Sequence, residues 1–261
     1  MDSPESMQQN TPSPIRTILF YVALCLTTIF AGSLCVILHR FTGGNEWPHL
    51  CARLWGRMNL WAAGVRVHIS GLHNIDRHGT YIYAANHQGW FDIFALLAWL
   101  PVQFRYLAKE ELFRIPFLGP AMTATGYIPI DRGDHRKAFR SLNVAAFKVR
   151  CGTSVLIFPE GTRSRDGVLQ EFKKGGFILA VKSGQPVVPI SISGSHHVFP
   201  KEEGWMIRPG AIRITVGKPV ATAHYAQKDK DVLLTAVRDA IRLHLPREEG
   251  GLEEPLSAAV R

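Results

Sequence analysis

An uncharged stretch of 22 residues, residues 17–38, limits more than any other feature what this chain can fold into. As a helix rising about 1.5 Å per residue it would be about 33 Å long, enough to cross the ~30 Å hydrocarbon core of a bilayer. A secretory signal peptide has a shorter apolar run and a basic start, whereas Asp2 and Glu5 precede this run. The stretch therefore predicts a membrane helix, with a buried core helix as the alternative.

Residues 46–64 predict a second helix of a different kind. Apolar residues recur there at spacings of three and four, which places them on one stripe of a helix: Trp47, Leu50, Leu54, Met58 and Trp61. Tryptophan beside arginine is typical of the bilayer interface, but such a stripe can also pack on a domain. We predict a membrane anchor over residues 15–64. The sequence leaves open whether its first helix spans the bilayer or forms a hairpin with the second helix in one leaflet.

The net charge of the chain indicates which kinds of molecule it binds. The 261 residues carry a net charge of +9, and both ends are acidic, so the basic residues belong to the middle. A body of this charge attracts anionic lipids, phosphorylated substrates or nucleic acid. Arg40, Arg53 and Arg57 follow the apolar stretch, which by the positive-inside rule places the body in the cytoplasm. Four cysteines without a CxxC pair indicate a reducing compartment and no zinc site.

From residue 65 to residue 245 the pattern is that of an α/β domain. Runs rich in β-formers lie at 65–70, 80–86, 154–159, 186–193 and 211–216. Helical stretches lie among them at 92–99, 135–150, 175–183 and 230–245. This order predicts a mostly parallel central sheet flanked by helices. Residues 1–14 and 246–261 are expected to be flexible ends.

Several common site motifs are missing from the sequence. It has no GxSxG, no HExxH, no GxxxxGK[ST] and no GxGxxG after a strand. These absences argue against the usual serine hydrolase, zinc protease and nucleotide-binding folds. The basic charge also lacks interleaved stacking aromatics, so we expect no nucleic-acid partner.

The segment Ala85–Asp92, ANHQGWFD, can carry chemistry because it follows a strand and leads into an apolar helix. His87 would lie on the exposed turn, and Asp92 near the first turn of the helix, where the helix dipole favours a carboxylate. A hydrogen bond from Asp92 would fix the imidazole tautomer and leave the second nitrogen as a base. Taken alone, a helix cap and a loop histidine explain the two residues better.

A second segment, Phe158–Ser164, reads FPEGTRS and closes the most apolar strand of the body. Ligands of open α/β sheets bind at the carboxyl ends of strands. Arg163 can hold a phosphate with two hydrogen bonds, and Gly161 lets backbone N–H groups approach it. Arg132 at the end of GYIPIDR, and the helix-opening segment 172–175, FKKG, are weaker signals that also fit a solvated basic surface.

Together these segments resemble the glycerolipid acyltransferases, and most of all the 1-acyl-sn-glycerol-3-phosphate (lysophosphatidic acid) acyltransferases. The resemblance rests on NHxxxxD at 86–92, GxxPIDR at 126–132, FPEGTR at 158–163 and VPI at 188–190, in that order. It extends over most of residues 45–220. FPEGTRS followed by FKKG is its more specific part.

The resemblance implies an activity: transfer of a fatty acyl group from acyl-CoA or acyl-carrier protein to the sn-2 hydroxyl of lysophosphatidic acid, giving phosphatidic acid. His87 would be the general base and Asp92 would orient it, with no acyl-enzyme, no cofactor and no metal. Lys109 matches a family lysine and would face the oxyanion or a phosphate. The remaining matched positions would bind substrate: Asn86, Arg132, Glu160, Gly161, Thr162 and Arg163.

Two alternatives remain open from the sequence. The acceptor could be glycerol 3-phosphate, a lysophospholipid or a lyso-aminolipid, because the motifs are largely shared. The chain could also be a membrane-anchored lipid-binding protein without catalysis, although a pure binder needs no His87–Asp92 pair. We expect membrane lipids as partners and a cytoplasmic or inner membrane location with the active site facing the cytoplasm.

Overall fold

The computed structural model of the protein describes residues 12–200 and 204–252. Two long helices come first, and a seven-stranded sheet with further helices follows. The helices are α1 (Pro14–Thr42), α2 (Glu46–Ala63), α3 (Phe91–Trp99), α4 (Leu118–Ala124), α5 (His135–Arg150), α6 (Gly175–Ser183), α7 (Ser195–Val198) and α8 (Lys230–Arg242). The strands are β1 (Val65–Ser70), β2 (Ile82–Ala85), β3 (Arg105–Lys109), β4 (Ile128–Ile130), β5 (Val155–Ile157), β6 (Val187–Ser193) and β7 (Gly210–Val216).

The sheet has the strand order β1-β7-β6-β2-β5-β3-β4. Its neighbouring strands pair in parallel, except that β6 and β7 are antiparallel. The predicted mostly parallel sheet is therefore confirmed. The strands that follow one another in the chain are often not neighbours in the sheet: β5 lies between β2 and β3.

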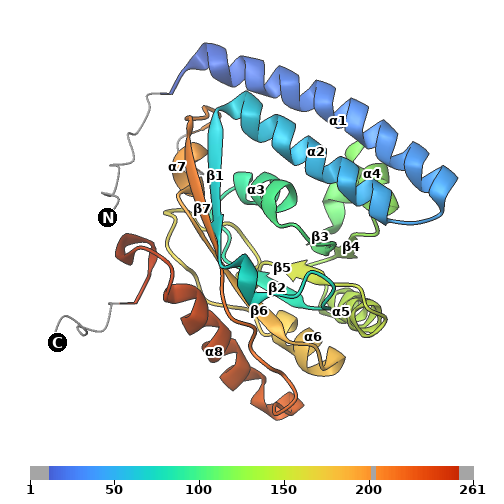
Figure 1. Ribbon diagram of the computed structural model, residues 1–261, viewed down its shortest axis with the longest axis vertical. Coiled ribbons are helices and arrows are strands. Elements are labelled where there is room, and N and C mark those ends of the chain that lie inside the picture. Colours follow the sequence, from blue (N-terminus) through green and yellow to red (C-terminus); the bar gives the residue numbers. More distant parts are fainter. Residues whose placement is uncertain (1–11, 201–203, 253–261) are drawn as a thin grey trace.

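Helices cover both faces of the sheet. In Figure 1, α1 to α4 lie on one side, which we call the upper face, and α5, α6 and α8 lie on the other, the lower face. Strand β2 shows how one strand serves both cores. Tyr83 and Ala85 belong to the core under α2 and α3, whereas Ile82 and Ala84 belong to the core under α5, α6 and α8. This alternation explains why the strand is apolar throughout.

The first two helices are packed on the domain along their length. Two glycines allow this close approach: a Cβ on Gly32 of α1 would lie 2.7 Å from the carbonyl oxygen of Phe117, and a Cβ on Gly56 of α2 would lie 2.8 Å from that of Phe94. Near the start of α1 the Thr17 hydroxyl accepts the backbone N–H of Ile207. Within the described residues, α1 is also the one helix long and apolar enough to cross a membrane, and 17% of its most apolar window is buried.

The apolar stripe expected on the second helix faces away from the domain. Trp47, Leu50, Leu54 and Trp61 are exposed and Met58 is partly buried, whereas the side that packs on the domain carries Cys51, Gly56, Leu60 and Ala63. Packing of the stripe on the domain, one of the two alternatives from the sequence, is therefore wrong. Large apolar residues are exposed along α1 as well. We call this surface the apolar hairpin face: Ile15, Ile18, Leu19, Val22, Leu26, Ile29, Phe30, Val36, Ile37 and Phe41 of α1 with Trp47, Leu50, Leu54 and Trp61 of α2.

The chain end differs from the expected flexible tail. Residues 247–249 form a 3-10 helix, and the side chain of Glu249 is buried, where Oε1 accepts the backbone N–H of Gly194 at 3.0 Å. The tail prediction is therefore wrong for residues 246–252, because a glutamate that looks solvated in the sequence binds a turn of the domain. The rest of that prediction, residues 253–261, and residues 1–11 of the expected flexible start lie outside the described residues.

Candidate active site

The two sequence segments singled out above meet at the carboxyl ends of β2 and β5, which are neighbours in the sheet. The chain leaves β2 toward α3 on the upper face and leaves β5 toward α6 on the lower face. Where neighbouring connections depart to opposite faces, a crevice opens at the strand ends. His87 follows β2 and Phe158–Arg163 follow β5, so the fold brings both segments to this crevice.

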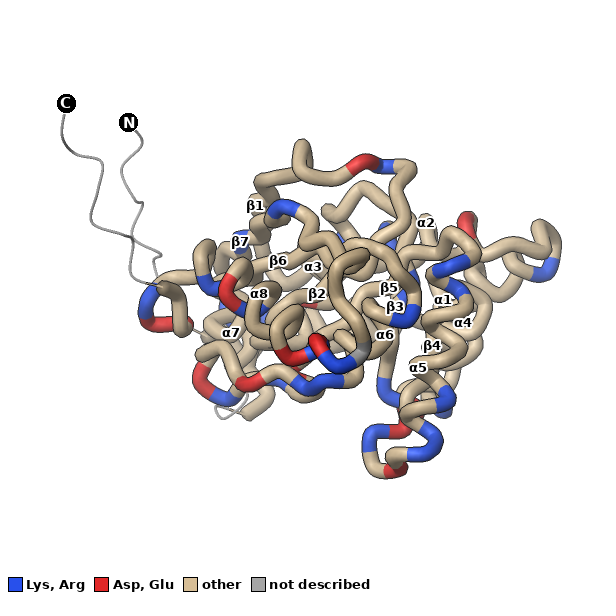
Figure 2. The backbone as a smooth tube through the Cα atoms, turned by 90° about the horizontal axis from the view of Figure 1, so that it is seen from below, with Lys and Arg blue, Asp and Glu red and all other residues tan. Residues whose placement is uncertain are grey.

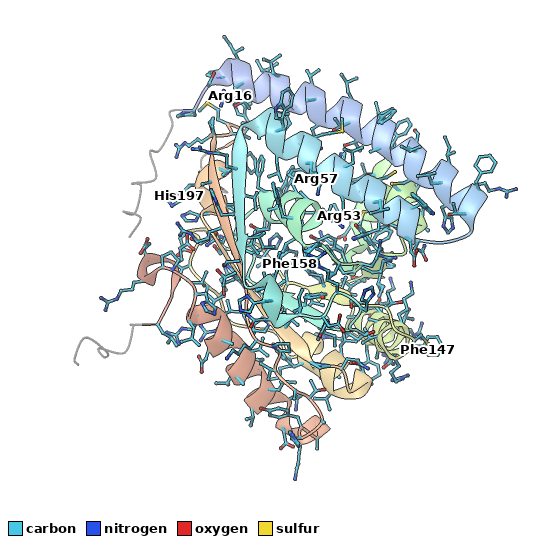
Figure 3. The ribbon with its side chains drawn as sticks, in the orientation of Figure 1. Arg16, Arg53, Arg57, Phe147, Phe158 and His197 are labelled. Carbon is cyan, nitrogen blue, oxygen red and sulfur yellow. The ribbon has the colours of Figure 1, made fainter. Side chains whose placement is uncertain are left out.

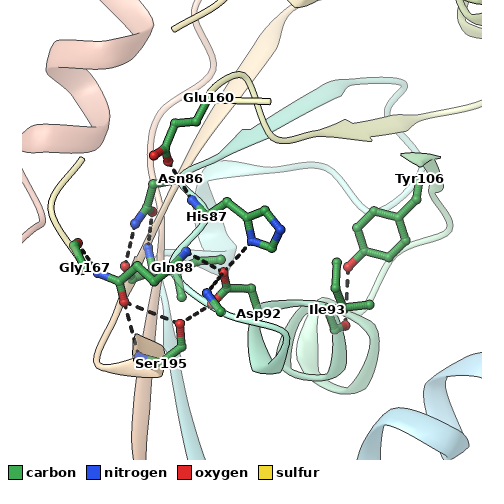
Figure 4. Close-up of polar contacts among 11 residues, drawn as sticks. Asn86, His87, Gln88, Asp92, Ile93, Tyr106, Glu160, Gly167 and Ser195 are labelled. Atoms are coloured by element: carbon green, nitrogen blue, oxygen red, sulfur yellow. Dashed lines mark hydrogen bonds and ion pairs between the residues drawn. The ribbon is translucent and has the colours of Figure 1, made fainter. Parts of the chain in front are cut away.

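The hydrogen bond expected between His87 and Asp92 is present. Nδ1 of His87 lies 2.7 Å from Oδ2 of Asp92, whose side chain is fully buried in the first turn of α3 (Figure 4). The same carboxylate oxygen accepts the backbone N–H groups of Gln88 and Gly89 at 2.7 and 2.9 Å. On its other side, Oδ1 accepts the hydroxyl of Ser195. The carboxylate is held from all sides and fixes the imidazole in turn.

The imidazole of His87 is also held across its ring face. It stacks on Phe158 with ring centroids 4.0 Å apart and an angle of 17° between the planes. The side chain of His87 is 13% exposed. Because Nδ1 is bound to Asp92, Nε2 is the nitrogen left for a bound molecule. This is the arrangement a general base requires.

Glu160 and Asn86, both predicted from the resemblance to bind substrate, make hydrogen bonds to the backbone. The Glu160 carboxylate accepts the backbone N–H of His87 at 2.7 Å and that of Gln170 at 3.2 Å. Asn86 exchanges two hydrogen bonds with the backbone of Ile192, at 2.8 and 2.7 Å. Both side chains are buried, and neither lines either of the two cavities described below. In the structure both side chains position the backbone on either side of the His87 turn, and their role as substrate-binding residues stays a prediction.

Burial changes the acidity of Glu160. Removal from water raises the pKa of its carboxyl group to about 7, although the two backbone N–H groups favour the charged form. The group next to the candidate base therefore changes charge near neutral pH.

A cavity of about 500 Å³ opens in front of His87, and we call it the upper cavity. Its walls come from α1, α2, α4 and the ends of β2, β3 and β5, and they are mainly apolar. Of the predicted site residues, these line it: His87, Lys109, Arg132, Gly161, Thr162 and Arg163. An apolar cavity with a few converging cations suits a ligand that has a hydrocarbon chain and an anionic head.

The three cations of the upper cavity are in different settings. Arg163 lies over the ring of Trp90, with its guanidinium carbon 5.3 Å from the ring centroid. Arg132 donates to the carbonyl oxygen of Gly161. Lys109 is half exposed and lies 2.8 Å from a carboxylate oxygen of Glu111. A phosphate in this cavity would meet Arg163 and Arg132 beside His87.

Three contributors were not found from the sequence: Ser195, Trp90 and Phe158. Ser195 follows β6, the other neighbour of β2, so its hydroxyl reaches Asp92 across 103 residues of chain. Trp90 and Phe158 stand inside the quoted segments, but only the fold shows them against Arg163 and His87. A hydroxyl two residues after the end of an apolar strand was the one available signal for Ser195.

One group of side chains in the described part of the chain has the composition of a metal site. His196, His197 and Glu249 place one ligand atom each within 4.8 Å of one another. None of the three lines the upper cavity. Burial, with a contribution from His197, lowers the pKa of His196 to about 4.

Comparisons with known proteins agree with the geometry. The family model described as Acyltransferase matches residues 66–193. The 1-acyl-sn-glycerol-3-phosphate acyltransferase of Pseudomonas aeruginosa is 32% identical over 213 residues, covering 80% of this chain and 81% of that protein. The chloroplastic 1-acyl-sn-glycerol-3-phosphate acyltransferase LPAT1 of Arabidopsis thaliana is 34% identical over 214 residues, which cover 80% of this chain.

The chain spans only 60% of the Arabidopsis protein and 56% of a similar chloroplastic protein from Brassica napus. Among solved structures, the 1-acyl-sn-glycerophosphate (LPA) acyltransferase PlsC of Thermotoga maritima matches with a TM-score of 0.75 and 28% identity. That match covers 87% of this chain and 92% of the Thermotoga chain.

Proposed function

This chain belongs to the 1-acyl-sn-glycerol-3-phosphate acyltransferase family, and from that membership we propose that it acylates lysophosphatidic acid at the sn-2 hydroxyl, giving phosphatidic acid. The acyl donor is a thioester of coenzyme A or of acyl-carrier protein. The observation that carries the proposal is the fixed His87–Asp92 pair in the wall of an apolar cavity that also holds Arg163.

The proposed reaction has two steps at His87. Nε2 takes the proton of the sn-2 hydroxyl while its oxygen attacks the thioester carbonyl, which gives a tetrahedral oxyanion and an imidazolium beside Asp92. The intermediate then expels the thiolate, which receives the proton from the imidazolium. Atoms and charge balance without an acyl-enzyme, because the hydroxyl attacks the donor directly.

We assign the three cations of the upper cavity to the negative charges of the reaction, which are the acceptor phosphate and the oxyanion. Arg163 and Arg132 hold the acceptor phosphate, with Gly161 and Thr162 beside them in the same wall. Lys109, whose carboxylate neighbour Glu111 lies outside the wall, is available to the oxyanion. Stabilisation of a developing charge by such a donor is typically worth several kcal/mol, or about 10²–10³ in rate.

For the membrane we propose that α1 and α2 lie together in one leaflet and do not span the bilayer. Contacts from Thr17, Gly32 and Cys35 tie α1 to the rest of the protein along its length, so a spanning α1 would have to give them up. The apolar hairpin face supports this placement because it is exposed on both helices. The upper cavity is walled by the same two helices, so a lipid acceptor reaches it from the membrane while the active site faces the cytoplasm.

Acyl transfer by the purified protein tests the proposal. The assay offers lysophosphatidic acid, glycerol 3-phosphate and lysophosphatidylcholine with acyl-CoA or acyl-carrier protein, and identifies the products by mass spectrometry. We expect phosphatidic acid to be the main product. A preference for another acceptor would identify a different acyltransferase. No product from any pair would support a lipid-binding protein without catalysis.

A further inference from the structure

A second cavity lies on the lower face of the sheet, between α5 and α6 at the carboxyl ends of β3, β4 and β5. We call it the lower cavity, and its volume is about 420 Å³. It shares four wall residues with the upper cavity: Leu107, Arg132, Phe158 and Gly161. The Phe158 ring, which stacks on His87, therefore lines both cavities beside the candidate base.

The polar lining of the lower cavity is cationic. Arg132, His135, Lys173 and Lys174 line it, and no Asp or Glu does so among the described residues. Lys174 is 60% exposed and lies 3.0 Å from Asp231, whereas no described carboxylate lies within ion-pair distance of Lys173. Lys173 instead lies over the FPEGTR turn: a Cβ on Gly161 would be 3.1 Å from its Nζ. These groups also surround the amino-terminal end of α6, whose dipole adds to the positive field.

The lower cavity and the apolar hairpin face lie on opposite faces of the sheet. It lies on the lower face with α5 and α6, whereas α1 and α2 lie on the upper face (Figure 1). Seen from below, charged positions are spread over the helices and loops (Figure 2). In the sequence of α1, Arg16 and Arg40 are the only Lys or Arg residues. With α1 and α2 on the membrane, the lower cavity faces water and is open to a water-soluble substrate.

We propose that the lower cavity binds the phosphate groups of the acyl donor, with Lys173 and Lys174 as their ligands. A donor bound there would extend its phosphopantetheine arm past Phe158 and Gly161 toward His87, and its acyl chain would enter the upper cavity. The two substrates then approach the base from opposite faces of the sheet, the acceptor from the membrane and the donor from water. This inference rests on the proposed function, because it names where that reaction takes its second substrate.

The test compares donor and acceptor kinetics of the full-length protein after removal of the two lysines. Lys173→Ala and Lys174→Ala are each expected to raise the KM for a medium-chain acyl-CoA about three- to tenfold, the discounted effect of losing one charge-assisted contact at an exposed site. The KM for lysophosphatidic acid should stay within about twofold of the wild-type value, since neither lysine lines the upper cavity, to which the acceptor is assigned. Lys218→Ala is the matched control, an exposed lysine on the loop after β7 that lines neither cavity.

A second variant blocks the lower cavity without changing its charge. Ala138 of α5 lines it, and Ala138→Trp should raise the donor KM and weaken binding of free coenzyme A in calorimetry. Running the assay also with acyl-carrier protein distinguishes the two sources of the phosphopantetheine, and a rise in donor KM in either arm supports the inference.

Unchanged donor KM in all three variants with both donors would overturn the inference while leaving the proposed function intact. A rise in acceptor KM alone would also overturn it and reassign the cavity to the acceptor. The wild-type protein could acylate no acceptor and still bind coenzyme A in a Lys173-dependent way. In that case the proposed function fails and the assignment of the cavity stands.

Discussion

The His87 imidazole is immobilised by three groups that come from different parts of the chain. Asp92 holds Nδ1, Phe158 covers one ring face, and Glu160 accepts the backbone N–H. Fixing a base in one orientation removes the cost of finding that orientation in every turnover. The consequences for single substitutions follow from which contact each one removes.

Replacement of His87 by alanine should lower kcat by about 10²–10⁴, the usual contribution of a general base. The hydroxyl of the acceptor attacks a thioester slowly unless its proton is removed. The measurement is kcat under saturating substrates, with circular dichroism and retained lysophosphatidic acid binding as controls for folding. Turnover near the wild-type rate would exclude His87 as the base.

Replacement of Arg163 by alanine should raise the KM for lysophosphatidic acid by roughly ten- to a hundredfold, because a charge-assisted hydrogen bond to phosphate is lost. Arg163→Lys should recover only part of the affinity, since an ammonium cannot hold phosphate with two parallel hydrogen bonds. The stacking of Arg163 on Trp90 favours the planar guanidinium as well. A rise in donor KM alone would assign Arg163 to the other substrate.

Ser195 is a positioning residue, because its hydroxyl donates to Oδ1 of Asp92 and does not line the upper cavity. Ser195→Ala should lower kcat about tenfold, the cost of one lost hydrogen bond to a charged group.

Ser195→Thr keeps the hydroxyl and should restore the rate. A kcat of Ser195→Thr as low as that of Ser195→Ala would show that the hydroxyl is not what matters at this position. That result would leave Ser195 with a purely structural role.

At the scale of elements, α1 and α2 each have one surface that packs on the domain and another that is exposed. One side fills the core of the domain, with Phe20 of α1 and Leu60 and Ala63 of α2 almost fully buried. The other side is the apolar hairpin face. A truncation of residues 1–64 would uncover the core, so we expect it to destabilise the domain. Loss of activity in such a fragment would therefore not test whether the two helices bind the membrane.

Substitutions on the apolar hairpin face test membrane binding separately from the packing of the two helices on the domain. The triple variant Leu19→Ser, Phe30→Ser and Leu54→Ser changes residues that are 63%, 59% and 48% exposed. Burial of one such side chain in an apolar medium is worth about 1.5–3 kcal/mol, so the binding to liposomes should weaken by at least roughly tenfold. The melting temperature should change little.

Flotation with liposomes measures this binding. Phe147→Ser is the matched control, since Phe147 is 61% exposed on α5, away from the hairpin (Figure 3). Equal flotation of the triple variant and the control would refute the membrane role of this face.

At the scale of the whole molecule, the domain depends on buried acids that tie distant segments together. Glu249 ties the chain end to the turn after β6, and Glu160 ties the turn after β5 to the turn after β2. Buried polar groups are costly unless they are fully bonded, so such ties make the stability of the whole domain sensitive to pH.

The sign of this pH dependence follows from Glu160, whose pKa is raised to about 7 by burial from an ordinary value of 4.5. Between these two values the unfolded chain has lost the proton that the folded protein keeps. The free energy of unfolding therefore falls as pH rises through this window.

Glu160→Gln does not titrate, so the melting temperature of the wild-type protein relative to this variant should fall by a few degrees between pH 5 and pH 8. Differential scanning calorimetry over this range makes the comparison. Parallel curves for the two proteins would show that Glu160 keeps the same charge in the folded and unfolded states.

Several strands and helices were predictable because their patterns are local. The strand at 65–70 and the helices at 135–150 and 175–183 have the predicted bounds, since hydrophobic periodicity records which face of an element is buried. Strand β3 and strand β4 were missed: β3 has a cation at each end, and β4 has three residues with a proline at its centre. Too little alternation remains in such short strands to separate them from loops.

The sequence by itself determined the fold class, the acyltransferase resemblance and the pairing of His87 with Asp92, whose five-residue separation one turn can close. Only the tertiary structure decided what Glu160, Asn86 and Ser195 do and which way the stripe of α2 faces. The partners of Glu160 and Ser195 in the His87 turn lie 73 and 103 residues away. Such contacts depend on the order of strands in the sheet, which no local pattern of residues records, because neighbours in the sheet are chosen by the packing of the whole domain.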